Sequence, residues 1–350
     1  MSHSTPVAES QEDREPAPAY ISFADLVSAI ETALLKAGAA AEAAAIVARN
    51  HAMCERDGSL SHGVFRVPQY VETLATGYLD GAAVPRVEQV TASYIRVDAA
   101  NGFAQVGLER ARESIMNTVA EQGVAVVAMR NSVHHSALWP DVEPFAHAGY
   151  VAFTAVTGGV PTVAPAGVRE AVLSTNPFAF ATPVQGAHPM VVDSATSSMS
   201  FGDLSLAARD GRPVPIGTGV DARGVETTDA GAIADGGTLL PFGGHKGAAL
   251  SMMVEILASA LTGGAFSVEA VVDKPAGAYP SRTGQFFLVV DPDRGWGGDF
   301  ASRVAGFLQM LRSAGMDRLP ADHRYASRAR AESRGVPVTQ AIGQLLAGQG

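Results

Sequence analysis

Cysteine is almost absent from this chain of 350 residues: Cys54 is the single one, so no disulfide can form within the chain. We expect Cys54 to be a small, buried apolar side chain rather than a nucleophile. No run of about eighteen or more apolar residues occurs, so the sequence predicts no membrane-spanning helix. Basic residues are also few. With 25 Lys and Arg against 35 Asp and Glu, the net charge of −10 argues against nucleic acid as a partner.

The remaining composition is that of a large globular protein. Hydrophobic residues make up 47% of the chain and charged residues 17%, which predicts a sizeable core and favours a homo-oligomer, most simply a homodimer. Residues 1–20 are acidic and rich in Pro and Ala, without the apolar stretch of a signal peptide, so we expect a disordered tail and a cytoplasmic protein. The short Arg-rich stretch 324–334 is interpreted as a solvated helix face.

Periodicity divides the rest of the chain into three parts. Residues 21–80 predict a helical segment that packs with the C-terminal region, with helices expected at 23–36, 41–54 and around Tyr70. Ser22, with Asp25 three residues on in a variant of the capping box, is expected to open the first helix, and Gly38 to end it. Residues 81–292 alternate short β-rich runs with helical stretches, and 293–350 predict further helices. We therefore expect an α/β fold with a mixed central sheet and helical N- and C-terminal segments.

Such alternation would also suit a doubly wound dinucleotide-binding sheet. The glycine-rich turn of that fold is missing, however, because Gly217-Thr218-Gly219 continues to Ala222 where a third glycine should stand. A dinucleotide bound here would need a non-Rossmann architecture.

One segment combines groups suited to acid catalysis and anion binding. Ser61-His62-Gly63 places an imidazole in a loop, and histidine can give and take protons near neutral pH. Arg66 follows four residues after His62, and its planar fork suits a carboxylate. The alternative is that Ser61 caps the following helix while Arg66 lies in solvent.

Three further segments carry polar side chains next to expected strands. His134 and His135 follow the strand expected at 124–129, where they line a crevice or simply pack. Thr175 lies in the turn 174–178. Asp193 and Asp203 offer carboxylates, and each could orient a histidine or cap a helix.

The glycine-rich turn 241–247 directly precedes a helix expected from Ala248 to Leu261. Glycines allow a ligand close to the backbone, a helix N-terminus favours negative charge, and Lys246 adds a cation. This pattern predicts a phosphate or pyrophosphate site; the alternative is an ordinary glycine loop with a solvated lysine.

Taken in order, these segments resemble the malate/L-lactate dehydrogenase-like family of nicotinamide oxidoreductases, over about 21–325. Within that family, 138–146 and 239–264 look like the Δ1-piperideine-2-carboxylate/Δ1-pyrroline-2-carboxylate reductases. The resemblance implies a non-Rossmann nicotinamide-binding fold and NADPH-dependent reduction of cyclic imino acids to L-pipecolate and L-proline. NADH remains a possible cofactor, and an NAD(P)-dependent dehydrogenase of malate, lactate or ureidoglycolate remains the alternative.

The resemblance also implies roles for individual residues. His62 matches the proton donor, with Ser61 and Asp203 as relay partners, while Arg66 and Thr175 match substrate-binding residues. The residues that match cofactor-contacting segments are His134, His135, Ser136, Ala137, Leu138, Asp193, Ser194, Ala195, His245, Lys246, Gly247 and Arg318. No metal site is expected. The segment 321–323 departs from the family, because Ala-Asp-His replaces the more usual Gly-Glu after the proline.

Overall fold

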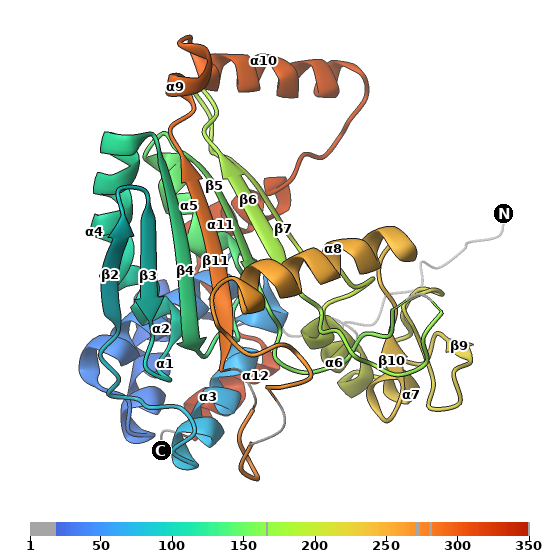
Figure 1. Ribbon diagram of the computed structural model, residues 1–350. Coiled ribbons are helices and arrows are strands. Elements are labelled where there is room, and N and C mark those ends of the chain that lie inside the picture. The colour runs from blue at the N-terminus through green and yellow to red at the C-terminus, as the bar shows by residue number, and fades with distance from the viewer. Residues whose placement is uncertain (1–18, 166, 271–273, 280–281, 349–350) are drawn as a thin grey trace, which may run out of the picture.

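A seven-stranded sheet forms the centre of the computed structural model, which describes residues 19–165, 167–270, 274–279 and 282–348 (Figure 1). In spatial order its strands are β2 (Arg86–Thr91), β3 (Tyr94–Asp98), β4 (Val124–Ser132), β11 (Thr283–Val290), β5 (Val151–Val156), β6 (Phe178–Thr182) and β7 (Met190–Ser194). Among these seven strands only β3 and β4 pair in parallel; the other neighbours are antiparallel. The expected mixed sheet is therefore confirmed, although β2 and β6 were not expected from the sequence.

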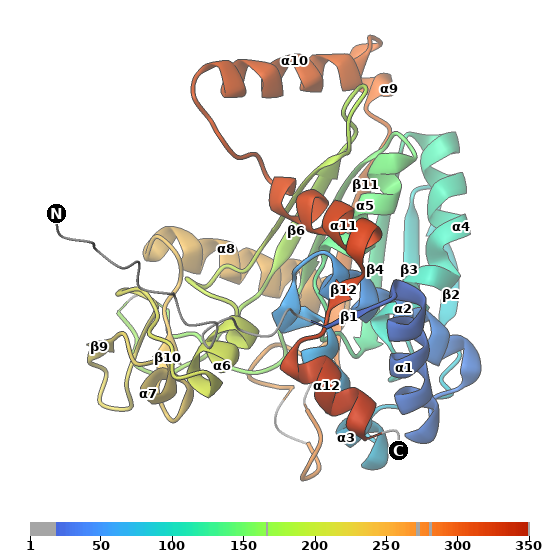
Figure 2. The ribbon, with the colours of Figure 1, turned by 180° about the vertical axis from the view of Figure 1, so that it is seen from behind.

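The two faces of this sheet differ in what covers them. Ala125, Val127 and Met129 of β4 alternate toward a fully buried face, which is covered by α4 (Ala104–Gln122) and α5 (Trp139–His147). Figure 2 shows α5 and α11 (Asp322–Arg334) on this side. The opposite face is crossed by α8 (His245–Glu255), visible in front of the sheet in Figure 1. Strand alternation thus buries one face completely and leaves the other only partly covered.

The two ends of the described chain meet in a helical layer. Its elements are β1 (Tyr20–Ile21), α1 (Phe23–Lys36), α2 (Ala41–Arg56), α3 (Val67–Ala75), β12 (Val336–Pro337) and α12 (Gln340–Ala347). Strands β1 and β12 pair antiparallel, and α12 packs on α1. Ser22 caps α1 as expected, by accepting a hydrogen bond from Asp25 N. Of the tail expected at 1–20, residues 1–18 lie outside the described residues, and Tyr20 belongs to β1.

A smaller lobe follows the sheet. It contains α6 (Phe201–Arg209), α7 (Ala230–Ala234) and three short strands, β8 (Gly219–Val220), β9 (Glu226–Thr227) and β10 (Thr238–Leu239). Leu204, Val214, Ile233 and Leu239 form its own apolar cluster. The lobe adjoins the last strands of the sheet, so residues that follow β7 lie between two packed bodies.

Two helical segments complete the fold. Helix α8 begins at His245, three residues earlier than expected, and continues into a π-helical turn, η4 (Ile256–Ala260). Helix α10 (Phe300–Ser313), preceded by α9 (Asp293–Trp296), stands away from the sheet at the top of Figure 1. No helix in the described part of the chain is long and apolar enough to cross a membrane.

Candidate functional site

The loop after α2 folds back into two 3-10 turns, η2 (Leu60–His62) and η3 (Val64–Arg66). Within it, His62 Nδ1 lies 2.9 Å from Ser61 Oγ. Arg66 Nε donates to the Ser61 carbonyl at 2.8 Å, so the imidazole and the guanidinium belong to one compact turn. The alternative that Ser61 caps α3 is wrong, because α3 has no side-chain cap and the Ser61 hydroxyl bonds to His62.

Both side chains are electrostatically perturbed by their surroundings. Burial, together with the nearby charge of Arg66, lowers the pKa of His62 to about 3. Burial also lowers the pKa of Arg66, to about 10. No carboxylate among the described residues forms an ion pair with Arg66. Its Nε and Nη1 donate to Ser61 O and Gln69 Oε1, and Arg66 is not one of the residues that line the cavity beside His62.

His62 faces a cavity of about 450 Å³ at the ends of the sheet strands. Its walls come from the turn that contains Ser59 and His62, the start of α5, the turn before β6 and the segment after β7. The lining residues are Ser59, His62, Ser136, Ala137, Leu138, Trp139, Thr175, Pro177, Asp193, Ser194, Ala195, Ser197, Ser198, Met199, Ser200, Asp203 and Arg324. Segments far apart in sequence therefore supply one half-open space with both polar and apolar walls, as small-molecule sites do.

Asp193, in the wall of this cavity, accepts hydrogen bonds that stabilise the start of α5. Its Oδ2 accepts hydrogen bonds from Leu138 N at 2.9 Å and Trp139 N at 2.8 Å, so it caps the N-terminus of α5 from across the chain. Burial raises the pKa of this carboxyl, and the backbone N–H of Trp139 opposes that effect. The capping alternative considered for Asp193 is correct in this form.

Asp203 lines the cavity but belongs first to the capping box of α6. Ser200 Oγ accepts from Asp203 N at 3.0 Å and donates to Asp203 Oδ2 at 2.7 Å. The charge of Asp203 raises the pKa of Arg66, which places it nearby, while Ser61 is the side chain bonded to His62.

Thr175 lies in a turn that is held by hydrogen bonds to neighbouring segments. Its carbonyl accepts hydrogen bonds from Thr196 N and Thr196 Oγ1. The next residue, Asn176, adopts a positive φ of 37° and donates from Nδ2 to Glu255 Oε1 at 2.9 Å. This buried network holds the Thr175 side chain at the cavity wall.

Six residues expected at the cofactor lie outside this lining; Arg318 lines the second cavity described below, and the other five are placed as follows. His134 Nδ1 accepts from Ser136 N, so Nε2 carries the hydrogen and donates to Asp141 Oδ2 at 3.1 Å. His135 packs its ring on Tyr70 at 5.0 Å. His245, Lys246 and Gly247 form the first turn of α8 instead of a loop before it. Phe242, just before that helix, donates from its N–H to the carbonyl of Thr196, which lies between the lining residues Ala195 and Ser197.

Two arginines of α11 are sites that the sequence interpretation missed. Arg324 lies over the Trp139 ring at 5.4 Å and lines the cavity. Arg328 is held by Asp57 at 2.6 Å and Glu143 at 2.9 Å. The expectation of a solvated helix face is therefore wrong for these two residues. Alternating Arg and apolar residues at 324–334 carry no local sign of which arginine is buried.

A second cavity, of about 270 Å³, shares Ser59 and Arg324 with the first. It opens at the N-terminus of α11, where Arg318 and His323 also line it. Arg318, which was predicted at the cofactor, thus lines a cavity that shares two wall residues with the cavity of His62. Cationic side chains and a helix N-terminus together suit a phosphate.

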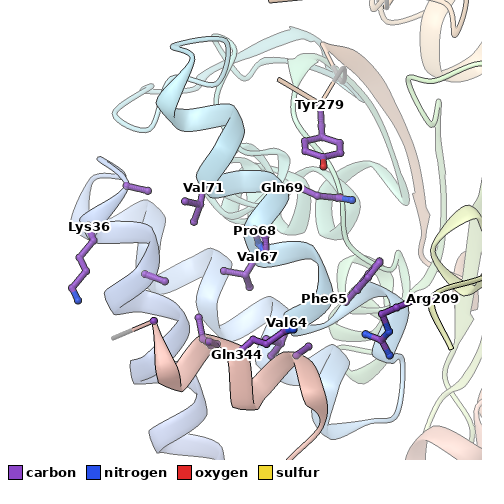
Figure 3. A pocket seen from close by; sticks show the side chains of 15 residues that line it. Lys36, Val64, Phe65, Val67, Pro68, Gln69, Val71, Arg209, Tyr279 and Gln344 are labelled. Carbon is purple, nitrogen blue, oxygen red and sulfur yellow. The ribbon is translucent and has the colours of Figure 1, made fainter. Parts of the chain in front are cut away.

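Another cavity, of about 620 Å³, lies elsewhere. It is a mainly apolar groove between α1, α3 and α12, with Val67, Val71 and Gln344 on its walls (Figure 3). None of His62, Thr175 or Asp193 lines it. Because a hydrogen-transfer site needs convergent polar groups, the 450 Å³ cavity is the better candidate.

Comparison with known proteins places this chain among relatives of the same length and fold. A protein with 48% identity over 321 residues, covering 92% of this chain and 93% of its own, is the Δ1-pyrroline-2-carboxylate/Δ1-piperideine-2-carboxylate reductase of Pseudomonas syringae pv. tomato. A Δ1-pyrroline-2-carboxylate reductase of Ancylobacter novellus is 36% identical, covering 93% of this chain and 96% of its own.

The fold is shared with a solved structure. The crystal structure of Δ1-piperideine-2-carboxylate reductase from Pseudomonas syringae pv. tomato superposes with a TM-score of 0.90 at 47% identity, covering 94% of this chain and 99% of that one. The model of the malate/L-lactate dehydrogenase family matches residues 21–347. The chain belongs to the malate/L-lactate dehydrogenase family.

Proposed function

We propose that the protein is an NADPH-dependent reductase of cyclic imino acids, which converts Δ1-piperideine-2-carboxylate to L-pipecolate and Δ1-pyrroline-2-carboxylate to L-proline. The relatives that carry these names cover more than nine tenths of the chain. The observation that carries the proposal is that one turn beside the 450 Å³ cavity holds both His62 and Arg66, for which the described residues supply no ion pair. A small anionic substrate with a basic nitrogen needs these two groups.

Arg66 supplies the orientation. Its guanidinium is already anchored by the bonds from Nε to Ser61 O and from Nη1 to Gln69 Oε1, which leaves Nη2 for a substrate carboxylate. A carboxylate held there fixes the adjacent imine carbon, and such positioning accounts for a large part of the rate enhancement of many enzymes. Thr175 adds a hydroxyl at the opposite wall.

His62 supplies the proton to the imine nitrogen. In the free protein its lowered pKa keeps the ring neutral at pH 7. A substrate carboxylate opposite Arg66 offsets the positive charge that is the second cause of that lowering, and so favours the protonated ring when substrate is bound. Ser61 Oγ at Nδ1 fixes the ring orientation, and Nε2 is then directed to the cavity. Asp203, predicted as a relay partner, adds negative charge near Arg66.

The residues around the cavity suit a nicotinamide dinucleotide, which supplies a hydride to the imine carbon when bound. The 450 Å³ and 270 Å³ cavities share Ser59 and Arg324 in their walls, so they are neighbours between His62 and the N-terminus of α11. Arg318, Arg324 and His323 there favour the extra phosphate of NADPH over NADH. The mostly antiparallel sheet supports a non-Rossmann mode of binding.

We further propose a homodimer formed by the less covered face of the sheet. Val126, Phe153, Phe180 and Leu288 are apolar and only partly buried on that face. Met252 and Ile256 on the neighbouring α8 and η4 are 52% and 60% exposed. An apolar surface of this kind is typical of an interface between subunits.

The alternative activity is reduction of a 2-keto acid, which the family's own description favours. To decide, NADPH oxidation is followed by absorbance with both cyclic imines, pyruvate and oxaloacetate. We expect turnover of the imines, with kcat/KM for the keto acids lower by at least about 10²-fold, the discrimination available when polar groups of a site lose their partners. Preferential turnover of a keto acid would establish the alternative.

A further inference from the structure

Helix α2 holds the turn that contains His62 through two buried side chains. His51 and Glu55 lie one helical turn apart on α2, with exposures of 0% and 3%. Side chains four residues apart share one face of a helix. Both point to the peptide groups that flank Gly63.

His51 bonds directly to the backbone of the proposed proton donor. Its Nδ1 lies 2.9 Å from the carbonyl oxygen of His62. Because a carbonyl can only accept, Nδ1 must carry the hydrogen. Burial lowers the pKa of His51 to about 4, so the ring is neutral at pH 7, and Nε2 has no hydrogen-bond partner among the described residues. His51 therefore acts as a fixed donor.

Glu55 holds the other side of the same glycine. Its Oε2 accepts from Val64 N at 2.9 Å, and its Oε1 accepts from Thr339 Oγ1 at 2.9 Å. A Cβ at Gly63 would overlap Glu55 Oε2, so no other residue fits between the helix and the turn. The two bonds together fix one carbonyl and one N–H on either side of Gly63.

We propose that His51 is a positioning residue for proton transfer: its hydrogen bond to the His62 carbonyl sets where the His62 imidazole meets the substrate nitrogen. This inference rests on the proposed role of His62. Arg66 is tied to the Ser61 carbonyl, and the Glu55 bond to Val64 N holds the chain leading to it. Loss of the His51 bond should thus affect the proton donor more than the carboxylate site.

Two substitutions separate the hydrogen bond from the packing of His51. His51→Asn keeps a donor at the position of Nδ1 but loses most of the ring. His51→Phe keeps a ring to pack edge-on against Tyr70, 5.2 Å away, but loses the donor. Val47→Ala, one turn earlier on α2 and fully buried, serves as a control for simple loss of packing.

The experiment compares kcat and KM for Δ1-piperideine-2-carboxylate, the solvent deuterium isotope effect on kcat, and the thermal midpoint of each variant. We expect His51→Phe to lose at least about tenfold in kcat, since a misplacement of about 1 Å can cost 10²-fold. Its KM should stay within about twofold and its solvent isotope effect should rise. His51→Asn should keep kcat within about threefold of the unchanged protein, although its thermal midpoint falls further than that of His51→Phe. Val47→Ala should lose stability without a change in isotope effect.

Two results would overturn the inference: His51→Phe as fast as the unchanged protein, or His51→Asn as slow as His51→Phe. If His51→Phe does not fold, the second comparison is made with His51→Leu, which also lacks the donor. His62→Gln is measured in parallel. A slow His62→Gln beside an unaffected His51→Phe would reject only the positioning role, whereas a fast His62→Gln would reject the proposed proton donor itself.

Discussion

Arg66 gives the sharpest prediction, because it is a cation that the described protein leaves without an ion pair. Lowering its pKa from 12.5 to about 10 corresponds, at about 1.4 kcal/mol per pH unit, to about 3 kcal/mol by which burial disfavours the charged form. A bound carboxylate offsets that cost. Removing one partner of such a buried pair costs about 3–5 kcal/mol. We therefore expect Arg66→Gln to raise the KM for Δ1-piperideine-2-carboxylate by about 10²–10³-fold.

The assay is steady-state NADPH oxidation, with cofactor affinity measured separately by quenching of protein fluorescence. Arg66→Lys is the matched variant: it keeps the charge but loses the planar fork, and we expect about a tenfold rise in KM. The substrate provides a second control, because Δ1-piperideine, which lacks the carboxylate, should be reduced equally slowly by all three proteins. The reasoning would be refuted by a KM for Arg66→Gln within threefold of the original, or by an effect confined to NADPH affinity.

Three further predictions concern ionisable groups of the site. His62→Gln should lower kcat by about 10²–10⁴-fold, the usual contribution of a positioned acid, and an unchanged kcat would contradict its role. His51, His62 and His135 have pKa values lowered by burial, so the unfolded chain binds more protons below about pH 6.5. The free energy of unfolding, measured by urea titration, should therefore fall as the pH drops from about 6.5 to 4, by up to about 4 kcal/mol per pH unit for three groups. Glu55 and Asp193, whose pKa values are raised, act in the opposite direction. A flat profile would contradict the burial of the histidines. Asp193→Asn should lower the free energy of unfolding by about 1 kcal/mol through loss of the charged cap on α5, and no change in a denaturant titration would argue against that contact.

Local patterns predicted the elements whose signals lie within a few residues. Helix α1 begins after the Ser22 cap and ends before Gly38, as expected from the capping box and apolar spacing. Strand β6 was missed because the turn at Thr175 was taken to extend through Phe178, which instead begins the strand. The start of helix α8 was expected three residues too late, because Gly243 and Gly244, directly before it, are typical of a loop. The start of this helix depends instead on its packing against Thr196, which is distant in sequence.

The same limit applies to the site. The grouping of Ser61, His62 and Arg66 follows from one short segment, and the structure keeps these side chains together. Contacts between segments that are distant in sequence could not be predicted in this way. Arg324 reaches the cavity because α11 packs beside α5, and Asp193 caps a helix more than fifty residues before it in sequence. These pairings are set by tertiary packing, which periodicity does not encode.

The most direct test of the proposed site is a crystal structure of the protein with NADPH and pyrrole-2-carboxylate, a planar analogue that keeps the ring nitrogen and carboxylate of the imine. The carboxylate should lie within hydrogen-bonding distance of Arg66 and the ring nitrogen should face His62, with the nicotinamide in the 450 Å³ cavity. A carboxylate bound away from Arg66, or the analogue bound in the apolar groove of Figure 3, would contradict the account.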